Sequence, residues 1–215
     1  MQQDLFVSQH FDIVDNQNPL FDESNYQKIK LNSRVKQDKY TKYIEDHFDL
    51  HISDTCSVSI PNKLILEELR PTWNIGVICG ASGSGKTTIL KHLCYEITKS
   101  SILPVPTFDN SKTLISNFDN LEPEEATLLL SQMGLASVPT WIRPYNVLSN
   151  GEQYRATLAK LMADNKKNEI IFVDEYTSVV DRNVAMAMSN ALQKYVRQNN
   201  KRVILSTCHY DVFDW

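Results

Sequence analysis

The residues best suited to carry chemistry lie in a short glycine-rich segment that follows an apolar run. Residues 80–87, GASGSGKT, fit the pattern G-x-x-x-x-G-K-[ST], and the apolar residues 74–79 come directly before them. Glycines let backbone N–H groups wrap a phosphate chain, and the start of a following helix attracts anions. In such a loop Lys86 reaches the β- and γ-phosphates, and the Thr87 hydroxyl ligates Mg²⁺. The pattern therefore predicts a phosphate-binding loop rather than a turn with a chance lysine.

Two adjacent carboxylates supply the second part of the predicted site. Asp174 and Glu175 directly follow the apolar residues 170–173. Because ligands bind at the carboxyl edge of parallel strands, Asp174 is predicted beside the phosphate loop, holding Mg²⁺. Glu175 is predicted to polarise a water for in-line attack on a γ-phosphate. Two acids after a strand more often lie in a solvated turn without a catalytic role. The phosphate loop in the same sequence favours the catalytic interpretation here.

ATP with Mg²⁺ is the ligand that these two motifs predict together. The metal ligands would be Thr87 and Asp174. The residues predicted to bind the nucleotide are Gly80, Ala81, Ser82, Gly83, Ser84, Gly85, Lys86, Thr87 and Thr88.

A serine at the start of a helix supplies a third motif. Residues 148–153 read LSNGEQ, and the apolar positions Leu158, Leu161 and Met162 follow at helical spacing. Ser149 suits the N-cap position, so the segment by itself predicts only a capped helix.

In combination with the other motifs, this segment resembles the signature peptide LSGGQ of the ATP-binding cassette ATPases. Ser149 lies 25 residues before Asp174, a step of the right size for that family. Asn150 replaces the first glycine of the signature and Glu152 replaces its glutamine. A glutamate there is more similar to the chromosome-maintenance and DNA-repair branch than to the transporters. The resemblance implies that Ser149, Asn150, Gly151 and Glu152 contact nucleotide bound to a second chain.

Two further elements of that family follow in the expected order. Ser178 and Asp181 stand where the D-loop would lie, and His209 ends the last predicted strand as the switch histidine would. The resemblance implies that His209 senses the γ-phosphate, although a lone histidine after a strand is usually structural. A neutral imidazole can donate from one nitrogen while a neighbour orients the other. The predicted catalytic residues are Lys86, Glu175 and His209.

The sequence departs from the family pattern after the first helix. The family's coupling glutamine is expected after a strand near residues 102–105, yet residues 101–120 contain no glutamine. Asp109 or Asn110 could take its place, and Gln132 lies within a predicted helix. This assignment stays open.

The aromatic residue that stacks on adenine is hard to identify in this sequence, and the helical insert is short. Tyr43 and Phe48 are the candidates for the aromatic residue that stacks on adenine. Only 63 residues separate Lys86 from Ser149, so the helical insert is smaller than in transporters. A docking surface for a membrane permease is hard to build from so short an insert.

Three segments narrow the resemblance. Residues 141–156, 173–182 and 206–215 resemble prokaryotic and phage cassette ATPases that precede an acetyltransferase-like module in one polypeptide. The resemblance covers about residues 74–215. It implies that further strands and the second module would follow residue 215.

Strands and helices alternate along the predicted core, which implies an α/β fold of the P-loop ATPase type with a mainly parallel sheet. A reduced helical insert is expected at about 101–147. A small antiparallel β piece is expected before the core, from about Phe48, with short strands at 47–52, 56–60 and 64–66. The predicted strands are 74–79, 169–173 and 202–207, and the predicted helices are 86–99, 123–133, 149–163 and 181–198.

The composition excludes several classes of protein. The chain has 215 residues, of which 42% are hydrophobic and 22% charged, and its net charge is −4. These values fit a globular domain and disfavour a globally basic nucleic-acid binder. No apolar run approaches a membrane span of about 18 residues, and the first residues carry acid where a signal peptide would be basic. The cysteines have no metal spacing, so we expect reduced thiols in a cytoplasmic protein; they are Cys56, Cys79, Cys94 and Cys208.

The N-terminal part is expected to be an extension of the ATPase domain. Residues 1–47 form this extension, acidic over 1–27 and basic over 28–42, and residues 48–215 form the ATPase domain. The basic residues, interleaved with tyrosines, could contact nucleic-acid phosphates, although a solvated linker or helix face is the commoner meaning of such a run.

These observations predict Mg²⁺-dependent ATP hydrolysis. The resemblance implies a head-to-tail dimer, since each chain has one phosphate loop and one signature. One alternative is an interaction module controlled by ATP, which would bind a second protein or nucleic acid and turn over slowly. A transporter subunit is disfavoured by the missing glutamine and short insert. A small-molecule phosphotransferase is disfavoured because residues 101–147 offer a single arginine, Arg143, for a lid.

Overall fold

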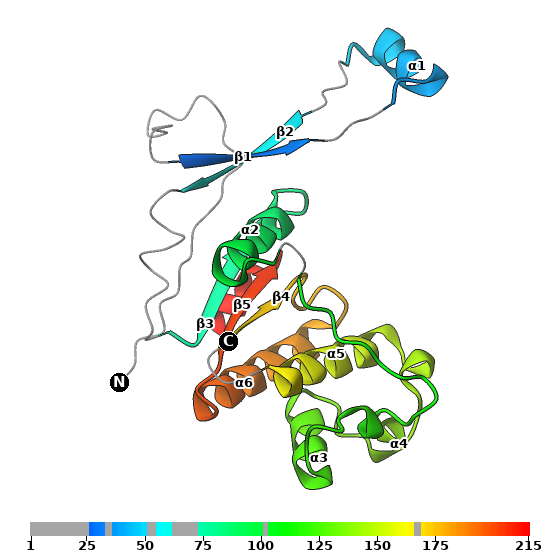
Figure 1. The fold of residues 1–215 in the computed structure, drawn as a ribbon, viewed down its shortest axis with the longest axis vertical. Coiled ribbons are helices and arrows are strands. Elements are labelled where there is room, and N and C mark those ends of the chain that lie inside the picture. Colours follow the sequence, from blue (N-terminus) through cyan, green and yellow to red (C-terminus); the bar gives the residue numbers. More distant parts are fainter. Residues whose placement is uncertain (1–25, 33–35, 51–54, 62–72, 101–102, 166–168) are drawn as a thin grey trace. The chain divides into compact units, whose positions relative to one another are not determined.

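A computed structural model describes residues 26–32, 36–50, 55–61, 73–100, 103–165 and 169–215 of the chain. The chain divides into two compact units. The larger unit holds the elements from residue 73 onward, and the smaller unit holds two strands and one helix that precede them. Figure 1 labels these elements along the chain.

The smaller unit contains a two-stranded antiparallel sheet. β1 (Tyr26–Asn32) pairs with β2 (Thr55–Pro61), with Tyr26 opposite Pro61 and Asn32 opposite Thr55. The sequence analysis predicted β2 but missed β1, which lies partly within the basic stretch 28–42. The prediction of a strand from about Phe48 was wrong at its start, because Phe48 is the last residue of a helix. Residues 51–52 of that strand and the piece predicted at 64–66 lie outside the described residues.

That helix, α1 (Lys39–Phe48), begins at a well-formed cap. The Asp38 carboxylate accepts from the backbone N–H groups of Tyr40 and Thr41, and the Thr41 hydroxyl accepts from the Asp38 N–H. These hydrogen bonds satisfy donors that the first turn of a helix leaves unpaired. No residue of α1 is buried.

The larger unit is built on a three-stranded parallel sheet. β3 (Ile75–Cys79), β5 (Arg202–Thr207) and β4 (Ile170–Val173) lie in that spatial order. Cys79 is opposite Thr207, and Val173 is opposite Leu205. All three strands run in one direction, so their carboxyl ends meet at one edge of the sheet, as expected for an α/β nucleotide-binding fold.

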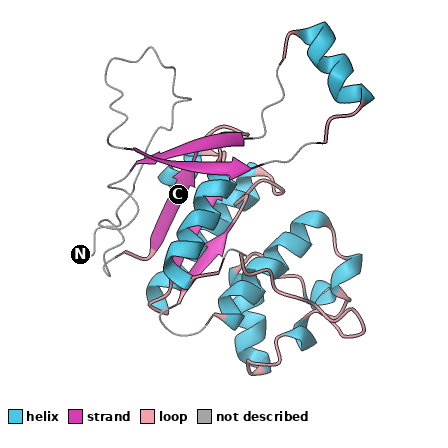
Figure 2. Ribbon diagram, turned by 45° about the horizontal axis from the view of Figure 1, so that its top comes forward, coloured by secondary structure: helices cyan, strands magenta, loops and turns pink. Residues whose placement is uncertain are grey.

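Helices cover both faces of this sheet, as Figures 1 and 2 show. α2 (Lys86–Thr98) packs against β3 and β5, and α5 (Asn150–Asp164) packs against β4. Side chains alternate along a strand, so neighbouring residues face opposite layers. One face joins a core formed with α5 and α6 (Arg182–Gln198) and presents Ile171, Val173, Val203 and Leu205.

A helical insert separates α2 from α5. It contains α3 (Pro123–Gln132) and the short α4 (Val138–Trp141), with single 3₁₀ turns at Ile115–Asn117 and Tyr145–Val147; a last 3₁₀ turn, Tyr210–Asp214, follows β5. Phe108 stacks on Tyr145 with ring centroids 4.0 Å apart, and the Trp141 indole donates to the Leu135 carbonyl oxygen. The Tyr145 hydroxyl also lies 3.1 Å from the Thr157 hydroxyl of α5, so the insert packs beside that helix.

The observed elements confirm the predicted α/β fold of the larger unit. The expected strand near residues 102–105, however, does not form within its described part, residues 103–105. Pro104 and Pro106 lack the N–H groups that a strand donates, which disfavours a ladder there. These residues line a cavity of about 520 Å³ beside Asp174.

No helix in the described part of the chain combines the length and the apolar character that a membrane crossing needs.

Candidate nucleotide-binding site

The glycine-rich loop joins the end of β3 to the start of α2. The Gly80 N–H donates to the Thr207 carbonyl oxygen at 3.3 Å, which ties the loop to the neighbouring strand β5. A Cβ atom at Gly80 would lie 2.7 Å from the Ser84 hydroxyl oxygen, so any larger residue would require the Ser84 side chain to turn away. Gly85 has φ of 90° at the N-cap of α2, a left-handed conformation that glycine adopts without strain. The loop thus curls back over the start of a helix.

Lys86 and Thr87 begin α2 and point to different partners. The Lys86 ammonium donates to the Ala81 carbonyl oxygen at 2.8 Å, so the side chain arches across the loop. The Thr87 hydroxyl donates to Asp174 at 3.2 Å. This second contact joins the first turn of α2 to the end of β4, across 87 positions of sequence.

Asp174 is held by a serine that the sequence analysis did not identify. The hydroxyl of Ser206, a fully buried residue of β5, donates to Asp174 Oδ1. The same hydroxyl oxygen accepts from the Glu175 N–H at 3.2 Å. Its signal in the sequence is a polar residue directly after the apolar residues 203–205 of the strand, but its partner is set only by the pairing of β4 with β5.

Asp174 and Thr87 suit a magnesium ion. Both present oxygen atoms, and Mg²⁺ in nucleotide sites takes one or two protein oxygens together with phosphate oxygens and waters. The described residues contain no group of three or more His, Cys, Asp and Glu side chains that could hold a metal alone. The donor set therefore fits a metal that is shared with a nucleotide.

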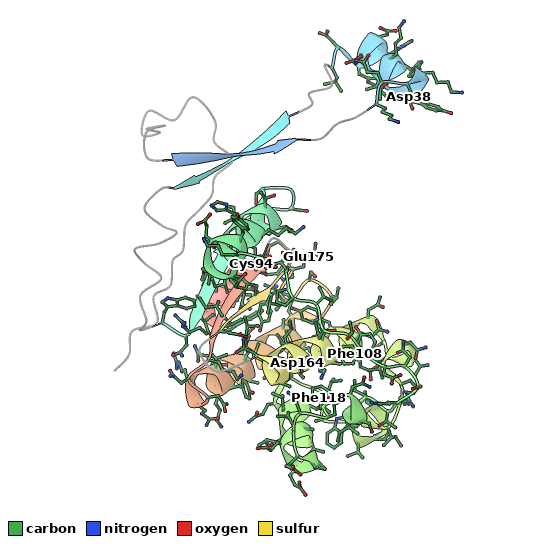
Figure 3. The ribbon with its side chains drawn as sticks, in the orientation of Figure 1. Asp38, Cys94, Phe108, Phe118, Asp164 and Glu175 are labelled. Atoms are coloured by element: carbon green, nitrogen blue, oxygen red, sulfur yellow. The ribbon has the colours of Figure 1, made fainter. Side chains whose placement is uncertain are left out.

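Glu175 lies at the sheet edge where β4 ends, as Figure 3 shows. Its side chain is exposed, and its backbone has φ of 49°. The Ser178 hydroxyl donates to its carboxylate at 3.5 Å. A non-glycine residue in this left-handed conformation is uncommon. Asp49 and Lys99 adopt it as C-caps of helices, whereas Glu175 adopts it directly after a strand.

His209 lies at the same edge and contacts a second left-handed residue. Its Nδ1 is 2.8 Å from the hydroxyl of Thr177, which is fully buried and has φ of 68°. Its backbone N–H donates to the Thr207 hydroxyl at 3.1 Å. Burial and, secondarily, the Arg182 guanidinium lower the pKa of His209 below its ordinary value, which favours the neutral ring.

Tyr154 and Tyr176 support this turn from the interior. The Tyr154 hydroxyl accepts from the Thr177 N–H at 3.4 Å, and the Tyr176 hydroxyl is 3.0 Å from that of Ser189. Burial raises the pKa of both tyrosines, so their hydroxyls stay protonated. The sequence analysis did not identify Thr177 or Tyr154 as parts of the site.

In the signature-like turn, Ser149 and Glu152 form reciprocal hydrogen bonds. Both the N–H and the hydroxyl of Ser149 donate to the Glu152 carboxylate, at 2.9 and 2.7 Å, and the Glu152 N–H donates back to the hydroxyl oxygen. Hydrogen bonds from Ser149 lower the pKa of Glu152. The Thr140 hydroxyl of α4 donates to the same carboxylate at 3.1 Å. Glu152 therefore links the signature turn to the helical insert.

Gly151 of this turn lies against the segment that follows Glu175. A Cβ atom at Gly151 would lie 3.6 Å from the Val179 carbonyl oxygen and 3.7 Å from the Val180 side chain. It would also lie 3.5 Å from the Arg155 guanidinium, whose Nε is buried without a hydrogen-bond partner.

The two residues predicted for the D-loop take different positions. Ser178 contacts Glu175, as described above, whereas Asp181 is the N-cap of α6 and accepts from the N–H groups of Asn183 and Val184, both at 3.0 Å. Beside it, Arg182 forms an ion pair with Asp211.

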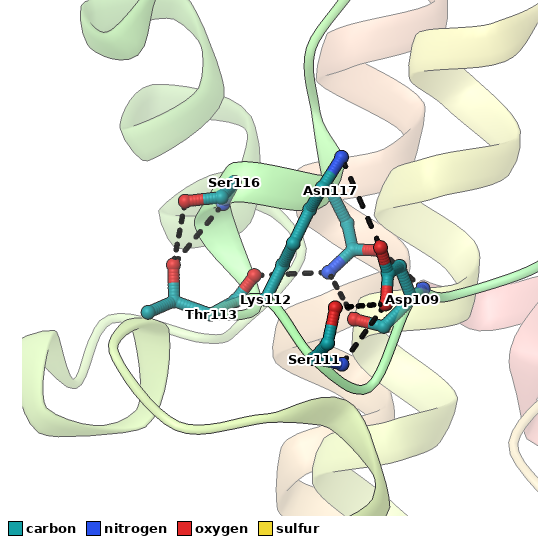
Figure 4. A network of polar contacts seen from close by, with 6 residues as sticks. All are labelled: Asp109, Ser111, Lys112, Thr113, Ser116 and Asn117. Atoms are coloured by element: carbon teal, nitrogen blue, oxygen red, sulfur yellow. Dashed lines mark hydrogen bonds and ion pairs between the residues drawn. The ribbon is translucent and has the colours of Figure 1, made fainter.

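The candidates for the missing glutamine belong to a polar network in the insert. The Asp109 carboxylate accepts from the N–H and hydroxyl of Ser111, and the Asn117 amide oxygen accepts from the Asp109 N–H at 2.7 Å, as Figure 4 shows. Asn110 accepts from the Asn146 N–H at 3.1 Å. Both candidate side chains thus hold the local turn, and their role toward a nucleotide stays a prediction.

Tyr43 and Phe48, the candidates for adenine stacking, lie on α1 in the smaller unit. Both are exposed, and Tyr43 stacks on His47 with centroids 4.0 Å apart. Their role also stays a prediction.

The sheet edge thus gathers a phosphate loop, a carboxylate suited to a metal and a second, exposed carboxylate. This combination defines a P-loop nucleotide triphosphatase.

Comparison with known proteins identifies the family. The family model described as "ATPase family associated with various cellular activities (AAA)" matches residues 77–215, more than half of the chain. The chain belongs to this family and is an ATPase.

The proteins similar to this chain include one curated relative and two solved structures. Lipoprotein-releasing system ATP-binding protein LolD of Rickettsia conorii is 28% identical over 188 residues, which cover 69% of this chain and 81% of the relative. The dimeric structure of MJ0796, a bacterial ABC transporter cassette, has a TM-score of 0.50 and 22% identity, and covers 65% of this chain and 76% of that chain. The dimeric post-hydrolysis state of MJ0796 bound to ADP and Pi has a TM-score of 0.55 and 18% identity. The match covers 76% of this chain and 85% of that chain. These structures confirm the cassette type of P-loop fold.

Proposed function

We propose that this chain hydrolyses ATP in a Mg²⁺-dependent reaction at the edge where β3, β4 and β5 end. The observation that carries the proposal is the 3.2 Å contact between the Thr87 hydroxyl and Asp174. It brings the helix that follows the phosphate loop and the strand that carries the acids to one point. Two oxygens at that point suit a metal that bridges protein and phosphate oxygens.

In this proposal the phosphate loop binds the β- and γ-phosphates. The Lys86 ammonium, which donates to Ala81, would exchange that carbonyl for phosphate oxygens, a stronger charge-assisted hydrogen bond. Backbone N–H groups at the start of α2 add favourable potential for the anion. Thr87 and Asp174 would hold Mg²⁺, which neutralises phosphate charge when bound.

Glu175 would act as the general base. Its exposed carboxylate follows directly after Asp174, and the Ser178 hydroxyl and the left-handed backbone orient it. A general base must lie within reach of the attacking water and be ionised at the working pH. His209 would bind the γ-phosphate through the ring nitrogen that faces away from Thr177.

We further propose that ATP joins two chains head to tail, with the signature turn of one chain on the γ-phosphate bound to the other. Support comes from the location of Ser149 at the start of α5, where the helix dipole attracts an anion. The dimeric MJ0796 cassettes share this fold. Residues 150–152 would complete the contact.

In this dimer Glu152 would compete with the γ-phosphate. Both donors of Ser149 are already given to the Glu152 carboxylate. A phosphate oxygen must replace that carboxylate as their acceptor, and the two anions repel each other. Glu152 therefore weakens the dimer relative to the family's glutamine.

The sequence also supports a cytoplasmic protein that is not a transporter, and one that precedes an acetyltransferase-like module. The short insert without a coupling glutamine supports a function other than transport. The resemblance of residues 141–156, 173–182 and 206–215 to cassette ATPases that precede such a module supports the second part. In this view ATP would control contact with a second protein or with nucleic acid.

A second candidate function is an ATPase subunit of a membrane-associated export system. The observation that favours it is the 28% identity to a lipoprotein-releasing ATP-binding protein. Under this hypothesis the insert around α3 and α4 would contact a membrane partner.

Phosphate release from purified protein tests the proposal. We expect turnover that needs Mg²⁺ and is lost in Asp174→Asn, with Asp119→Asn, at an exposed position in the insert, as the matched control. Equal turnover in EDTA would contradict it. Stimulation by DNA or by an acetyltransferase-like protein would support the soluble function, and stimulation only by liposomes carrying a membrane partner would support the export function.

A further inference from the structure

The hydroxyl of Thr177 lies between two hydrogen-bond partners. It donates to the Tyr176 carbonyl oxygen at 2.6 Å, and it is 2.8 Å from Nδ1 of His209. A hydroxyl has one proton, so a hydroxyl that donates to Tyr176 can only accept from the ring. Nδ1 must then carry a proton, and a neutral imidazole has none left for Nε2. In this arrangement His209 is therefore the Nδ1–H tautomer.

This tautomer is unsuited to a phosphate ligand. Its Nε2 presents a lone pair, whereas phosphate oxygens need hydrogen-bond donors. A doubly protonated ring would donate from both nitrogens, but burial and Arg182 lower the pKa of His209. The ring is therefore neutral near pH 7, and its tautomer decides what Nε2 can offer.

A second donor allows the Thr177 hydroxyl to turn. The Thr207 hydroxyl also donates to the Tyr176 carbonyl oxygen, at 2.9 Å. If the Thr177 O–H rotates toward Nδ1, this buried carbonyl keeps one hydrogen bond, so no buried polar group is left unpaired. Both orientations of the hydroxyl are thus satisfied.

The backbone holds the hydroxyl in this position. Thr177 is fully buried, so water does not compete for its proton. A β-branched residue at φ of 68° is strained, and contacts on both sides maintain it. The Thr177 N–H donates to Tyr154, and the Tyr176 N–H donates to the Ser206 carbonyl oxygen at 2.7 Å.

We propose that the Thr177 hydroxyl is a two-position donor that selects the tautomer of His209, and that the γ-phosphate of ATP moves it from Tyr176 to Nδ1. Without nucleotide, His209 carries its proton on Nδ1. With ATP, Thr177 donates to Nδ1 and the proton lies on Nε2, from which it donates to the phosphate. The ring loses one proton and gains one through solvent, so its charge does not change.

The proposal rests on the proposed function, because it requires ATP at this edge. Thr177 is a positioning residue in it, since it acts on the nucleotide only through His209. The tautomer of the nucleotide-free protein can be measured separately, so the two proposals can fail independently.

Nitrogen NMR of protein labelled with ¹⁵N-histidine tests the tautomer directly. Spectra of the full chain are recorded at pH 7.5 without nucleotide, and then in Glu175→Gln with ATP and Mg²⁺; His209→Gln assigns the signals. We expect the Nδ1–H pattern without nucleotide and the Nε2–H pattern with ATP. Either an Nε2–H pattern without nucleotide or an unchanged pattern after ATP binding overturns the proposal. Calorimetry on the same samples reports whether ATP binds at all.

Variants of Thr177 test the consequence for turnover. Thr177→Val keeps the shape but removes the hydroxyl, and we expect kcat to fall about five- to ten-fold, the size of one lost hydrogen bond, with KM for ATP within about two-fold. Thr177→Ser should restore both kcat and the tautomer pattern. Ser189→Ala is the matched control, because it removes a buried hydroxyl of α6 that is hydrogen-bonded to the neighbouring Tyr176 side chain. Unchanged kcat in Thr177→Val also overturns the proposal; if that variant does not fold, the wild-type spectra still decide.

Discussion

The two halves of the proposed site are held by different kinds of contact. At the sheet edge, polar side chains reach across elements, as in the contacts from Thr87 to Asp174 and from Thr177 to His209. In the signature turn, Ser149 and Glu152 contact each other three residues apart. The edge is therefore preorganised by the fold, whereas the turn is closed by a local cap that a ligand can open. This difference predicts different responses to substitution.

Lys86→Ala should have the largest effect, because it removes the charge that faces the phosphates at the preorganised edge. We expect calorimetry to detect no ATP binding. Lys194→Ala, which removes an exposed lysine on α6, should bind ATP like the wild type. Unchanged affinity in Lys86→Ala would contradict the assignment of the phosphate loop.

Glu175→Gln should separate chemistry from binding at the same edge. ATP affinity should remain, while turnover falls by about 100-fold or more, the usual scale for a lost general base. Single-turnover phosphate release measures this step, and Glu124→Gln on α3 is the charge-matched control. Normal turnover in Glu175→Gln would make Glu175 a structural turn residue.

Ser149→Arg should disrupt the contact of the signature turn with the second chain and leave the nucleotide site at the sheet edge intact. A large cation in place of the cap serine should prevent the ATP-dependent dimer, while ATP affinity of the single chain changes little. Light scattering of this substitution in the Glu175→Gln background, at saturating ATP, measures the dimer. Ser137→Arg, at an exposed position in the insert, should still dimerise. A monomeric Glu175→Gln protein would defeat the head-to-tail model itself.

Glu152→Gln should act in the opposite direction. The amide keeps a hydrogen-bond acceptor for Ser149 but removes the negative charge near the γ-phosphate, so we expect a dimer several-fold tighter. The cap should weaken by less than about 1 kcal/mol, which thermal unfolding measures. A weaker dimer in this variant would show that the carboxylate supports the contact rather than opposing it.

The smallest effect concerns pH. The pKa of His209 is lowered from its ordinary 6.5 by burial and Arg182, so the folded chain releases this proton more readily than the unfolded chain does. Its contribution to stability is complete above pH 6.5 and is lost as the pH falls through the lowered pKa. Thermal unfolding between pH 7.5 and 5 should therefore show a smaller acid loss in His209→Gln. An equal loss would indicate that His209 is not desolvated in solution.

Local patterns were sufficient to predict most elements of the larger unit. The strand predicted at 202–207 matches β5, and the helix predicted at 181–198 begins one residue before α6. Apolar periodicity and caps act over a few residues, so they can be read along the chain. The strand near 102–105 was predicted from the family pattern, and its prolines oppose it locally.

Pairing between distant residues could not be predicted in this way. β1 pairs with β2 across the segment that contains α1. Ile29 and Leu31 alternate with lysines, a short strand signal that the sequence analysis passed over because it interpreted 28–42 as a basic stretch. The contact of Thr140 with Glu152 likewise depends on how α4 packs beside α5.

The sequence by itself determined the order of the motifs, the chemistry of Lys86, Asp174 and Glu175, and the cap at Ser149. Only the tertiary structure decided that Ser206 would hold Asp174 and that Thr177 would contact His209. The partners in each of these contacts are 32 residues apart and meet because β4 and β5 lie side by side in parallel. A hydrogen bond needs its two atoms within about 3 Å, and strand pairing, rather than residue type, sets which atoms come that close.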